Sequence, residues 1–301
     1  MTIINSLQDI PSISSAVVTI GFFDGFHLGH KKIIDTVLSL SKDKKKSVVI
    51  TFTNHPLSVI SPSKTPKMIS PLDYKEEFLS SKKFDYLVLL EFTPSLMKMK
   101  AISFINHILE KIKNVEFVIG SDFRFGYKNE GDSFFLKEYS MIKKFGVIVV
   151  PPVIKNGIRV SSSFIRKIIT EGKVKEAKNL LGREFFVEGK VAHGDGRGKK
   201  IGFPTANIEL SSEIIAPKFG VYKGFTIIDS KKYDCFIFVG NKKLGKTLDN
   251  TIVEAFIKDF DKNIYDKILR IFFESFIREV INFENTERLI EQIKMDISNF
   301  S

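Results

Sequence analysis

Apolar strand-like runs alternate with amphipathic helical patterns along the first part of this chain, and that alternation restricts the fold more than any other feature. It predicts a parallel sheet that helices cover on both faces. Ligands of such sheets bind beyond the carboxyl ends of the strands. The loops 21–30, 53–56 and 120–126 each follow a strand, so we expect them to form one site. The predicted strands are 17–20, 47–53, 86–91, 116–120 and 147–150, and the predicted helices lie near 29–41, 73–82, 101–112, 133–144 and 161–170.

The pattern changes after about residue 183, where strand-like runs follow one another with only turns between them. This predicts an antiparallel barrel or sandwich, followed by an amphipathic helix near 284–298. A helical segment at 165–181 connects the two parts. We therefore expect an α/β chain with a doubly wound parallel sheet in residues 1–182 and an antiparallel domain in residues 183–301. The predicted strands of the second domain are 185–191, 219–228, 232–239, 251–256 and 268–276.

The composition points to a cytoplasmic protein. The 301 residues, of which 43% are hydrophobic, suffice for packed cores. No apolar run has membrane-spanning length, and residues 1–11 lack the features of a secretory signal. Cys235 is the only cysteine, so no intrachain disulfide can form, and its apolar surroundings indicate a small buried residue. We expect no membrane partner.

The net charge of +11 is compatible with nucleic-acid binding and with binding of polyphosphates. The lysines are scattered, however, and the 29 phenylalanines do not alternate with a basic stripe as they would in a base-stacking surface. We therefore expect small-molecule ligands, no nucleic acid, and a monomer or weak homo-oligomer.

The run Gly-Phe-Phe-Asp-Gly-Phe-His-Leu-Gly-His at 21–30 lies between an apolar run and an amphipathic segment. This order predicts a strand, a tight turn and a helix, so backbone N–H groups and the positive end of the helix dipole converge on the turn. Its glycines allow close backbone approach, and His27 and His30 add donors that can carry charge near neutral pH. The alternative, two surface histidines beside an ordinary turn, is disfavoured by the flanking strand and helix. The candidates for phosphate binding here are Gly21, Phe23, Asp24 and Gly29.

Three other segments carry polar residues after strands or at a helix start. Ser161, Ser162 and Ser163 precede Arg166 at a predicted helix start, where serines alone favour capping but the upstream histidines favour a phosphate site. The segment 120–126 reads most simply as a structured loop with an internal pair between Asp122 and Arg124. In the segment 51–56, His55 reads most simply as the cap of a turn before Pro56.

The whole chain resembles the family of bacterial bifunctional riboflavin kinase/FAD synthetases. The matching segments, in family order, are 21–30, 51–56, 120–126 with 131–132, 161–166, 181–183 and 202–207, and Arg278, Phe283 and Asp296 match near the C-terminus. The turn at 21–30 resembles the HxGH nucleotidyltransferase signature. The resemblance implies a nucleotidyltransferase domain in residues 1–182 and an antiparallel β-barrel kinase domain in residues 183–301. The kinase half would phosphorylate riboflavin to FMN with Mg²⁺ and ATP, and the other half would adenylylate FMN with a second ATP, giving FAD and pyrophosphate.

For the adenylyltransferase half, the resemblance implies that His27 and His30 are catalytic and face the adenylyl phosphate. Gly21, Phe23, Asp24 and Gly29 would bind ATP, while Ser161, Ser162, Ser163 and Arg166 would hold the departing pyrophosphate. The flavin or nucleotide pocket would be lined by His55, Pro56, Asp122, Phe123, Arg124 and Phe125.

For the kinase half, the resemblance implies that Glu254 accepts the proton of the riboflavin 5′-hydroxyl, although a charged residue in an apolar strand usually faces solvent. Thr205 and Asn207 would be the Mg²⁺ ligands, since hard oxygen donors suit that ion and alternate residues of a strand share a face. The ATP-binding residues would be Gly194, Gly198, Lys200, Gly202 and Pro204, in a glycine-rich basic segment suited to phosphates.

One segment departs from the family pattern. Where the family has a Pro-Thr-Phe stretch, residues 239–245 read Val-Gly-Asn-Lys-Lys-Leu-Gly. This leaves open a monofunctional FAD synthetase with a degenerate, flavin-binding kinase-like domain. A third hypothesis is an RNA-binding or regulatory protein built on a retired nucleotidyltransferase, which the net charge favours and the retained histidines oppose.

Overall fold

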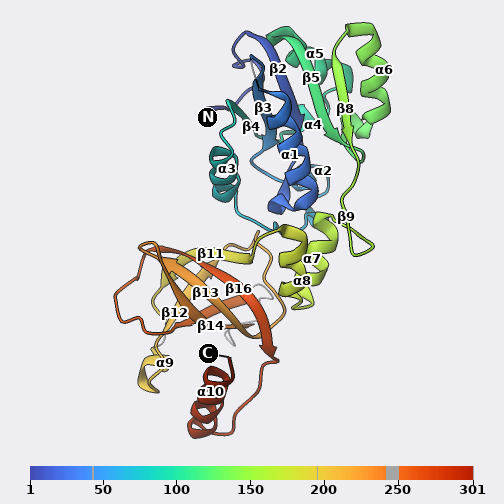
Figure 1. The fold of residues 1–301 in the computed structure, drawn as a ribbon. Helices are drawn as coiled ribbons and strands as arrows, with labels where there is room; N and C mark the ends of the chain where they lie inside the picture. The colour runs from blue at the N-terminus through green and yellow to red at the C-terminus, as the bar shows by residue number, and fades with distance from the viewer. Residues whose placement is uncertain (43, 195, 242–250, 301) are drawn as a thin grey trace. The chain divides into compact units, whose positions relative to one another are not determined.

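The chain folds into two compact units. The computed structural model describes residues 1–42, 44–194, 196–241 and 251–300. One unit consists of residues 1–66 and 72–161, and the other of residues 67–71 and 162–301. The first is built on an open sheet and the second on a closed β-barrel (Figure 1).

A sheet of six parallel strands forms the centre of the first unit. The strands are β1 (Thr2–Ile4), β2 (Ile13–Ile20), β3 (Lys46–Phe52), β4 (Tyr86–Leu90), β5 (Ile112–Gly120) and β8 (Gly146–Val150). Their spatial order is β1-β4-β3-β2-β5-β8. From β2 the chain adds β3 and then β4 on one side, and afterwards crosses back to add β5 on the other. The strand order therefore reverses between β2 and β5.

Helices join successive strands of the sheet (Figure 1). They are α1 (Leu28–Leu40), α2 (Leu57–Ile60), α3 (Leu72–Ser81), α4 (Pro94–Met97), α5 (Ala101–Lys111) and α6 (Ser133–Lys143), with 3-10 turns η1 (Asp24–Phe26), η2 (Pro62–Lys64) and η3 (Tyr127–Asn129). Two short antiparallel pairs are β6 (Arg124–Phe125) with β7 (Gly131–Asp132), and β9 (Ile154–Lys155) with β10 (Ile158–Arg159).

Both faces of this sheet are buried. Alternate residues of a strand point to opposite faces. Val18 of β2 packs in a hydrophobic cluster with Phe104 and Ile108 of α5. Its neighbour Val17 points to the opposite face and is also fully buried, although it is not part of that cluster. Helix α1, whose Ile34 is fully buried, contacts β2 and β5. The predicted doubly wound sheet is thereby confirmed.

The second unit is a closed antiparallel barrel. Its strands are β11 (Phe185–Ala192), β12 (Thr205–Leu210), β13 (Gly220–Ile228), β14 (Lys231–Asn241), β15 (Thr251–Ile257) and β16 (Ile268–Arg278). They close in the order β11-β12-β15-β14-β13-β16. Val253, Ala255 and Ile257 alternate as buried residues along β15, so the residues between them lie on the outer face.

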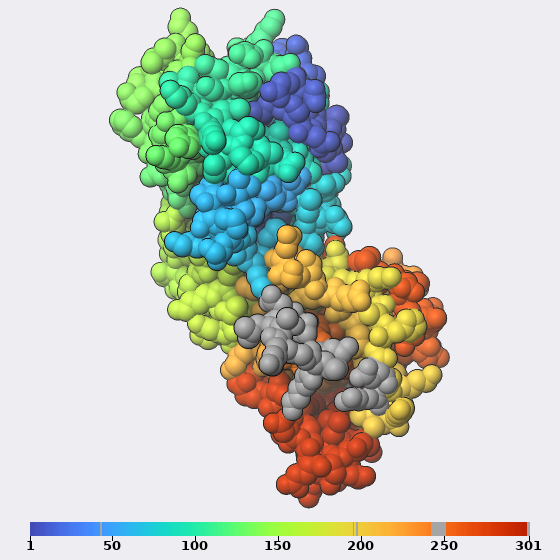
Figure 2. All heavy atoms as spheres, turned by 180° about the vertical axis from the view of Figure 1, so that it is seen from behind, coloured from blue at the N-terminus to red at the C-terminus, as the bar shows by residue number. Residues whose placement is uncertain are grey.

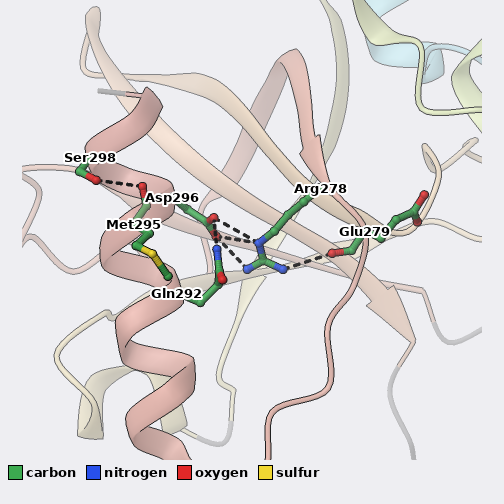
Figure 3. Close-up of polar contacts among 6 residues, drawn as sticks. All are labelled: Arg278, Glu279, Gln292, Met295, Asp296 and Ser298. Carbon is green, nitrogen blue, oxygen red and sulfur yellow. Dashed lines mark hydrogen bonds and ion pairs between the residues drawn. The ribbon is translucent and has the colours of Figure 1, made fainter.

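An ion pair ties the C-terminal helix α10 (Thr286–Phe300) to the barrel (Figure 3). Arg278, at the end of β16, donates from Nη2 and Nε to Asp296 Oδ2 at 2.8 and 3.0 Å. Gln292 Nε2 also donates to Asp296, at 2.9 Å. Asp296 is only 6% exposed, so this charge is buried and fully hydrogen-bonded from two elements. In the space-filling view the red C-terminal segment projects from the barrel (Figure 2).

Helices α7 (Ser162–Thr170) and α8 (Val174–Leu181) belong to the barrel unit, where α8 contacts β11 and β16. The segment 67–71 also belongs to it. Met68 N donates to Glu213 O at 2.7 Å, and its carbonyl accepts from Ile215 N at 2.9 Å. The short helix α9 (Arg197–Lys200) follows β11.

Each predicted strand and long helix occurs, with boundaries shifted by a few residues. The sequence reasoning missed β1, which has only three residues, and β12, which directly follows Pro204. The single helical segment expected at 165–181 is two helices, because the chain turns at Gly172 with φ +79°.

Candidate functional site

Two of the predicted site loops leave the sheet where its strand order reverses. β2 ends at Ile20 and the neighbouring parallel strand β5 ends at Gly120. Ligands of open α/β sheets bind at such a reversal, because the loops diverge there and leave a crevice. The loop after β3 emerges from the same edge, since β3 is also parallel to β2. The fold thus brings the three loops predicted from the sequence to one edge of the sheet.

The turn after β2 has an unusual backbone. Phe23, Gly25 and Phe26 have φ values of +54°, +80° and +46°, in the left-handed region that phenylalanine rarely adopts. Both phenylalanine rings are buried, and a Cβ on Gly21 would lie 2.9 Å from the Phe23 ring. Asp24, which lies between the two phenylalanines in the sequence, is only 4% exposed. Packing therefore holds the turn in one conformation.

His27 and His30 lie together at the start of α1. His27 caps the helix, because its Nδ1 accepts the backbone N–H of His30 at 3.3 Å. A neutral His27 therefore carries its proton on Nε2, which leaves Nε2 as a donor. The His27 and His30 rings are stacked, and the His30 ring is nearly perpendicular to the Phe23 ring, with 5.3 Å between their centroids. A Cβ on Gly29 would lie 3.0 Å from the His27 ring, so glycine leaves room for that ring.

The loop after β3 is attached to its neighbours through polar and aromatic contacts. His55 Nδ1 accepts the backbone N–H of Leu57 at 3.1 Å, which confirms its predicted capping role around Pro56. The His55 and Phe22 rings form a T-shaped pair with 4.7 Å between their centroids. Asn54, which the sequence reasoning did not single out, exchanges two hydrogen bonds with the backbone of Phe92 after β4.

The sequence reasoning also missed Lys75 of α3, which is only 5% exposed. Burial lowers its pKa to about 7, against the attraction of the Asp24 carboxylate, which raises it. A signal was present in the sequence. Lys75 is four residues before Leu79 and three after Leu72, so it lies on the apolar stripe of an otherwise polar helix.

The pair expected between Asp122 and Arg124 is wrong. Asp122 pairs with Arg159 at 2.8 Å, and Arg124 pairs with Asp132, which the β6–β7 register places directly opposite it. The Phe123 and Phe125 rings stack at 5.0 Å between centroids, with Phe123 half-buried and Phe125 in the hydrophobic core. Exposed charges and a partly buried aromatic face therefore alternate along this loop.

The serine segment lies where the two units join along the chain. Ser161 closes the first unit, and Ser162 begins α7 in the second. Ser163 is exposed, and Arg166 Nε donates to the Lys67 carbonyl at 2.9 Å. The joint action of this segment with His27 and His30 stays a prediction.

In the barrel, three predicted kinase residues share one face. Asn207 of β12 is registered directly opposite Glu254 of β15, and Thr205 Oγ1 donates to Glu254 Oε2 at 3.5 Å. All three residues are half-buried on the outer face of the barrel. Paired positions on adjacent strands place side chains on the same face, so Glu254 is not an isolated solvated residue.

The glycine-rich segment before β12 packs tightly on these residues. A Cβ on Gly194 would lie 2.2 Å from Asn207 Nδ2, and one on Gly198 would lie 2.4 Å from the Phe203 carbonyl and 3.3 Å from Thr205 Oγ1. Lys200, Gly202 and Pro204 are exposed at its end. Glycine at 194 and 198 thus permits close approach to both candidate metal ligands.

The segment 239–245 is the one whose sequence differs from the family pattern. Its first three residues, Val239–Asn241, end β14, and residues 242–245 lie outside the described residues. Within the described residues, no cluster of three or more His, Cys, Asp or Glu side chains is arranged to hold a metal, and no helix could span a membrane. Cys235 is fully buried, and burial raises its pKa to about 12, as expected of an inert thiol.

Comparison with known proteins finds one family model for each of the two parts of the chain. The family model described as FAD synthetase matches residues 9–164, and the one described as riboflavin kinase matches residues 181–301. The bifunctional riboflavin kinase/FMN adenylyltransferase of Buchnera aphidicola subsp. Schizaphis graminum is 34% identical over 99% of this chain and 97% of its own length. The enzyme of the same name from Listeria monocytogenes is 33% identical over 93% of this chain and 90% of its own.

A solved structure shares the whole fold. The crystal structure named as a macrolide-efflux protein from Streptococcus pneumoniae superposes with a TM-score of 0.88 at 31% identity, over 99% of this chain and 98% of that one. The two family models together match most of the chain, and the curated relatives carry both activities in their names. The chain therefore belongs to the bifunctional riboflavin kinase/FMN adenylyltransferases.

Proposed function

We propose that the two units divide the two activities of this family. The chain phosphorylates riboflavin to FMN with ATP and then adenylylates FMN with a second ATP, releasing FAD and pyrophosphate. We assign adenylyl transfer to the open sheet and phosphoryl transfer to the barrel. The observation that carries the first assignment is the stacked His27–His30 pair at a helix N-terminus, beside the reversal of strand order.

In adenylyl transfer, a phosphate oxygen of FMN attacks the α-phosphorus of ATP as the bond to the β-phosphate oxygen breaks. Negative charge grows on the α-phosphate oxygens and on the departing pyrophosphate. Nε2–H of His27, the His30 ring and the first N–H groups of α1 would stabilise that charge electrostatically. No covalent intermediate with the protein is required, because positioning and charge stabilisation carry the step.

The other predicted residues of this half would bind rather than react. Gly21, Phe23, Asp24 and Gly29 would bind ATP, and the glycines would let its phosphates approach the backbone. Ser161, Ser162, Ser163 and Arg166 would hold pyrophosphate through hydroxyls and a guanidinium. The loops carrying His55, Pro56, Asp122, Phe123, Arg124 and Phe125 would line the flavin or nucleotide pocket, with Phe123 the half-buried aromatic surface on which a ring could stack.

In the barrel, Glu254 would accept the proton of the riboflavin 5′-hydroxyl while that oxygen attacks the γ-phosphorus of ATP and ADP departs. Thr205 and Asn207 offer a hydroxyl and a carbonyl oxygen beside this carboxylate, a donor set that suits Mg²⁺. When bound, the ion would neutralise phosphate charge. Gly194, Gly198, Lys200, Gly202 and Pro204 would form the loop that covers the phosphates.

We further propose that the protein acts in the cytoplasm as a monomer or weak homo-oligomer, without nucleic acid. Size-exclusion chromatography with light scattering of the purified chain, with and without a mixed RNA pool, tests the oligomeric state and the absence of nucleic acid. A stable larger assembly or RNA co-elution at physiological salt would contradict them.

Separation of flavins after incubation with riboflavin, ATP and Mg²⁺ tests the whole proposal. FAD formed from riboflavin supports both activities. FAD formed only when FMN is supplied would favour a monofunctional synthetase with a degenerate kinase-like domain. Absence of both products, with the protein folded, would contradict the proposal.

A further inference from the structure

The buried ammonium of Lys75 lies behind the turn that carries the catalytic histidines. Lysine is almost never fully buried unless it is paired, so a lysine 5% exposed calls for an explanation. Asp24, in the turn itself, is equally buried, and its carboxylate attracts the Lys75 charge.

Lys75 Nζ contacts the ends of two strands. It donates to the Phe52 carbonyl at 2.8 Å and to Thr51 Oγ1 at 3.2 Å, both at the carboxyl end of β3. It also lies 4.2 Å from the centroid of the Phe22 ring, which follows β2. Thr51 Oγ1 in turn donates to the Phe22 carbonyl at 3.2 Å. The Lys75 side chain of α3 therefore links Phe22 to β3 in two ways. It contacts the Phe22 ring directly, and it reaches the Phe22 carbonyl through the Thr51 hydroxyl.

The backbone that follows Phe22 needs such support. Phe23 and Phe26 both have positive φ, a backbone conformation that is strained for phenylalanine. Such a conformation persists only where its surroundings over-determine it. Immediately after this turn, His27 caps α1 and stacks on His30, so a displacement of Phe22 would move both imidazoles.

We propose that Lys75 is a positioning residue for adenylyl transfer, holding Phe22 and the turn after it against β3 so that His27 and His30 keep their places. The inference rests on the proposed role of the two histidines. Lys75 itself touches neither the histidines nor any group that reacts. Lys75 contributes preorganisation, because it holds the turn in place before the reaction begins. Other interactions in the folded protein offset the free-energy cost of burying its charge.

The test compares Lys75→Met and Lys75→Arg with a matched control, Lys82→Met. Methionine keeps the aliphatic length but removes the Nζ, whereas arginine keeps charge and donors. Lys82 follows the same helix and has its own aromatic and acidic neighbours, Phe78 at 5.7 Å and Asp35 at 3.6 Å, but no contact with the turn. Thr51→Val is a second variant, which removes the bridging hydroxyl with little change in volume.

We expect Lys75→Met to lower kcat for conversion of FMN to FAD by on the order of 10²-fold, as a misplacement of about 1 Å can do. The KM for ATP and the phosphorylation of riboflavin should change little. Lys75→Arg should recover part of kcat, Thr51→Val should show a smaller loss, and Lys82→Met should match the wild type. The assays are run at a temperature at which the unfolding curves show that every variant is folded.

A purely structural role would lower thermal stability in Lys75→Met yet leave kcat of the folded protein unchanged, which would overturn the inference. Equal losses in Lys75→Met and Lys82→Met, or no recovery in Lys75→Arg, would also overturn it. If Lys75→Met does not fold, wild-type kcat in Thr51→Val decides against the role. A wild-type chain unable to convert FMN would instead contradict the proposed function.

Discussion

The imidazole rings of His27 and His30 stack with their centroids 3.6 Å apart and their planes 19° from parallel. His27 is the N-cap of α1 and His30 lies three residues further along, in the first turn, and residues three apart on a helix lie on the same side of it. Because the two rings lie against each other, an α-phosphate bound at this site would contact both imidazoles at once.

Replacement of either histidine should therefore have a similar effect. We expect His27→Ala and His30→Ala each to lower the rate of FAD formation from FMN by on the order of 10²–10³, the usual loss when one donor to a developing oxyanion is removed. Because the barrel carries the other activity, riboflavin phosphorylation should persist. Flavin separation by chromatography measures both, and near-normal FAD synthesis in both variants would refute the assignment.

The barrel site allows proton transfer to be separated from nucleotide binding. Glu254→Gln should reduce riboflavin phosphorylation by roughly 10²–10⁴-fold, as the loss of a general base does. Affinity for Mg-ATP should survive, since Thr205 and Asn207 supply the proposed metal contacts. Asn207→Ala should instead weaken Mg-ATP binding, measured by titration calorimetry. Unchanged phosphorylation in Glu254→Gln, beside an active parent, would rule out its role as base.

A side chain added at Gly194 should disturb the barrel site through Asn207. A Cβ at position 194 would lie 2.2 Å from Asn207 Nδ2, so Gly194→Ala should displace that amide and weaken Mg-ATP binding. Since the effect acts through one partner, Gly194→Ala combined with Asn207→Ala should bind no worse than Asn207→Ala alone, a non-additive pair. Additive losses in the double variant would show that Gly194 acts by another route.

Lys75 should make stability depend on pH in a defined window. Its pKa is about 7 in the folded chain and 10.5 for an ordinary lysine, mainly because burial disfavours the charge. Between these values the unfolded chain binds a proton that the folded chain does not, so stability rises with pH. Relative to Lys75→Met, the wild type should gain stability from about pH 7 to about pH 10 in urea unfolding. A constant difference across that window would contradict the lowered pKa.

A fragment that begins with α7 should be more stable than one that begins with β11. Val174, Ala177, Leu180 and Leu181 of α8 are buried, and α8 contacts β11 and β16. Removing them would expose apolar surface at roughly 25 cal/mol per Å². Residues 162–301 should therefore unfold at a higher temperature than residues 183–301 in calorimetry. Equal midpoints would favour a domain boundary at 182/183 over one before α7.

The sequence by itself determined the fold class and the chemical character of both sites. Periods of two and of 3.6 residues are local properties, so the long helices and most of the long strands could be predicted to within a few residues, whereas β1 and β12 were missed. The turn at 21–30 was recognisable for the same reason, since its glycines, its histidines and the elements on either side are contiguous in the chain.

Only the tertiary structure decided which residues face one another. Strand order placed the loops after β2 and β5 side by side, and barrel register put Asn207 opposite Glu254. Asp122 and Arg124, expected to pair with each other, have partners from other segments. Lys75 is buried against the end of β3, where it contacts residues 23 and 24 positions away in the sequence. The partners in such contacts come from distant segments, so a local pattern can indicate that a residue is buried but not which residues it meets.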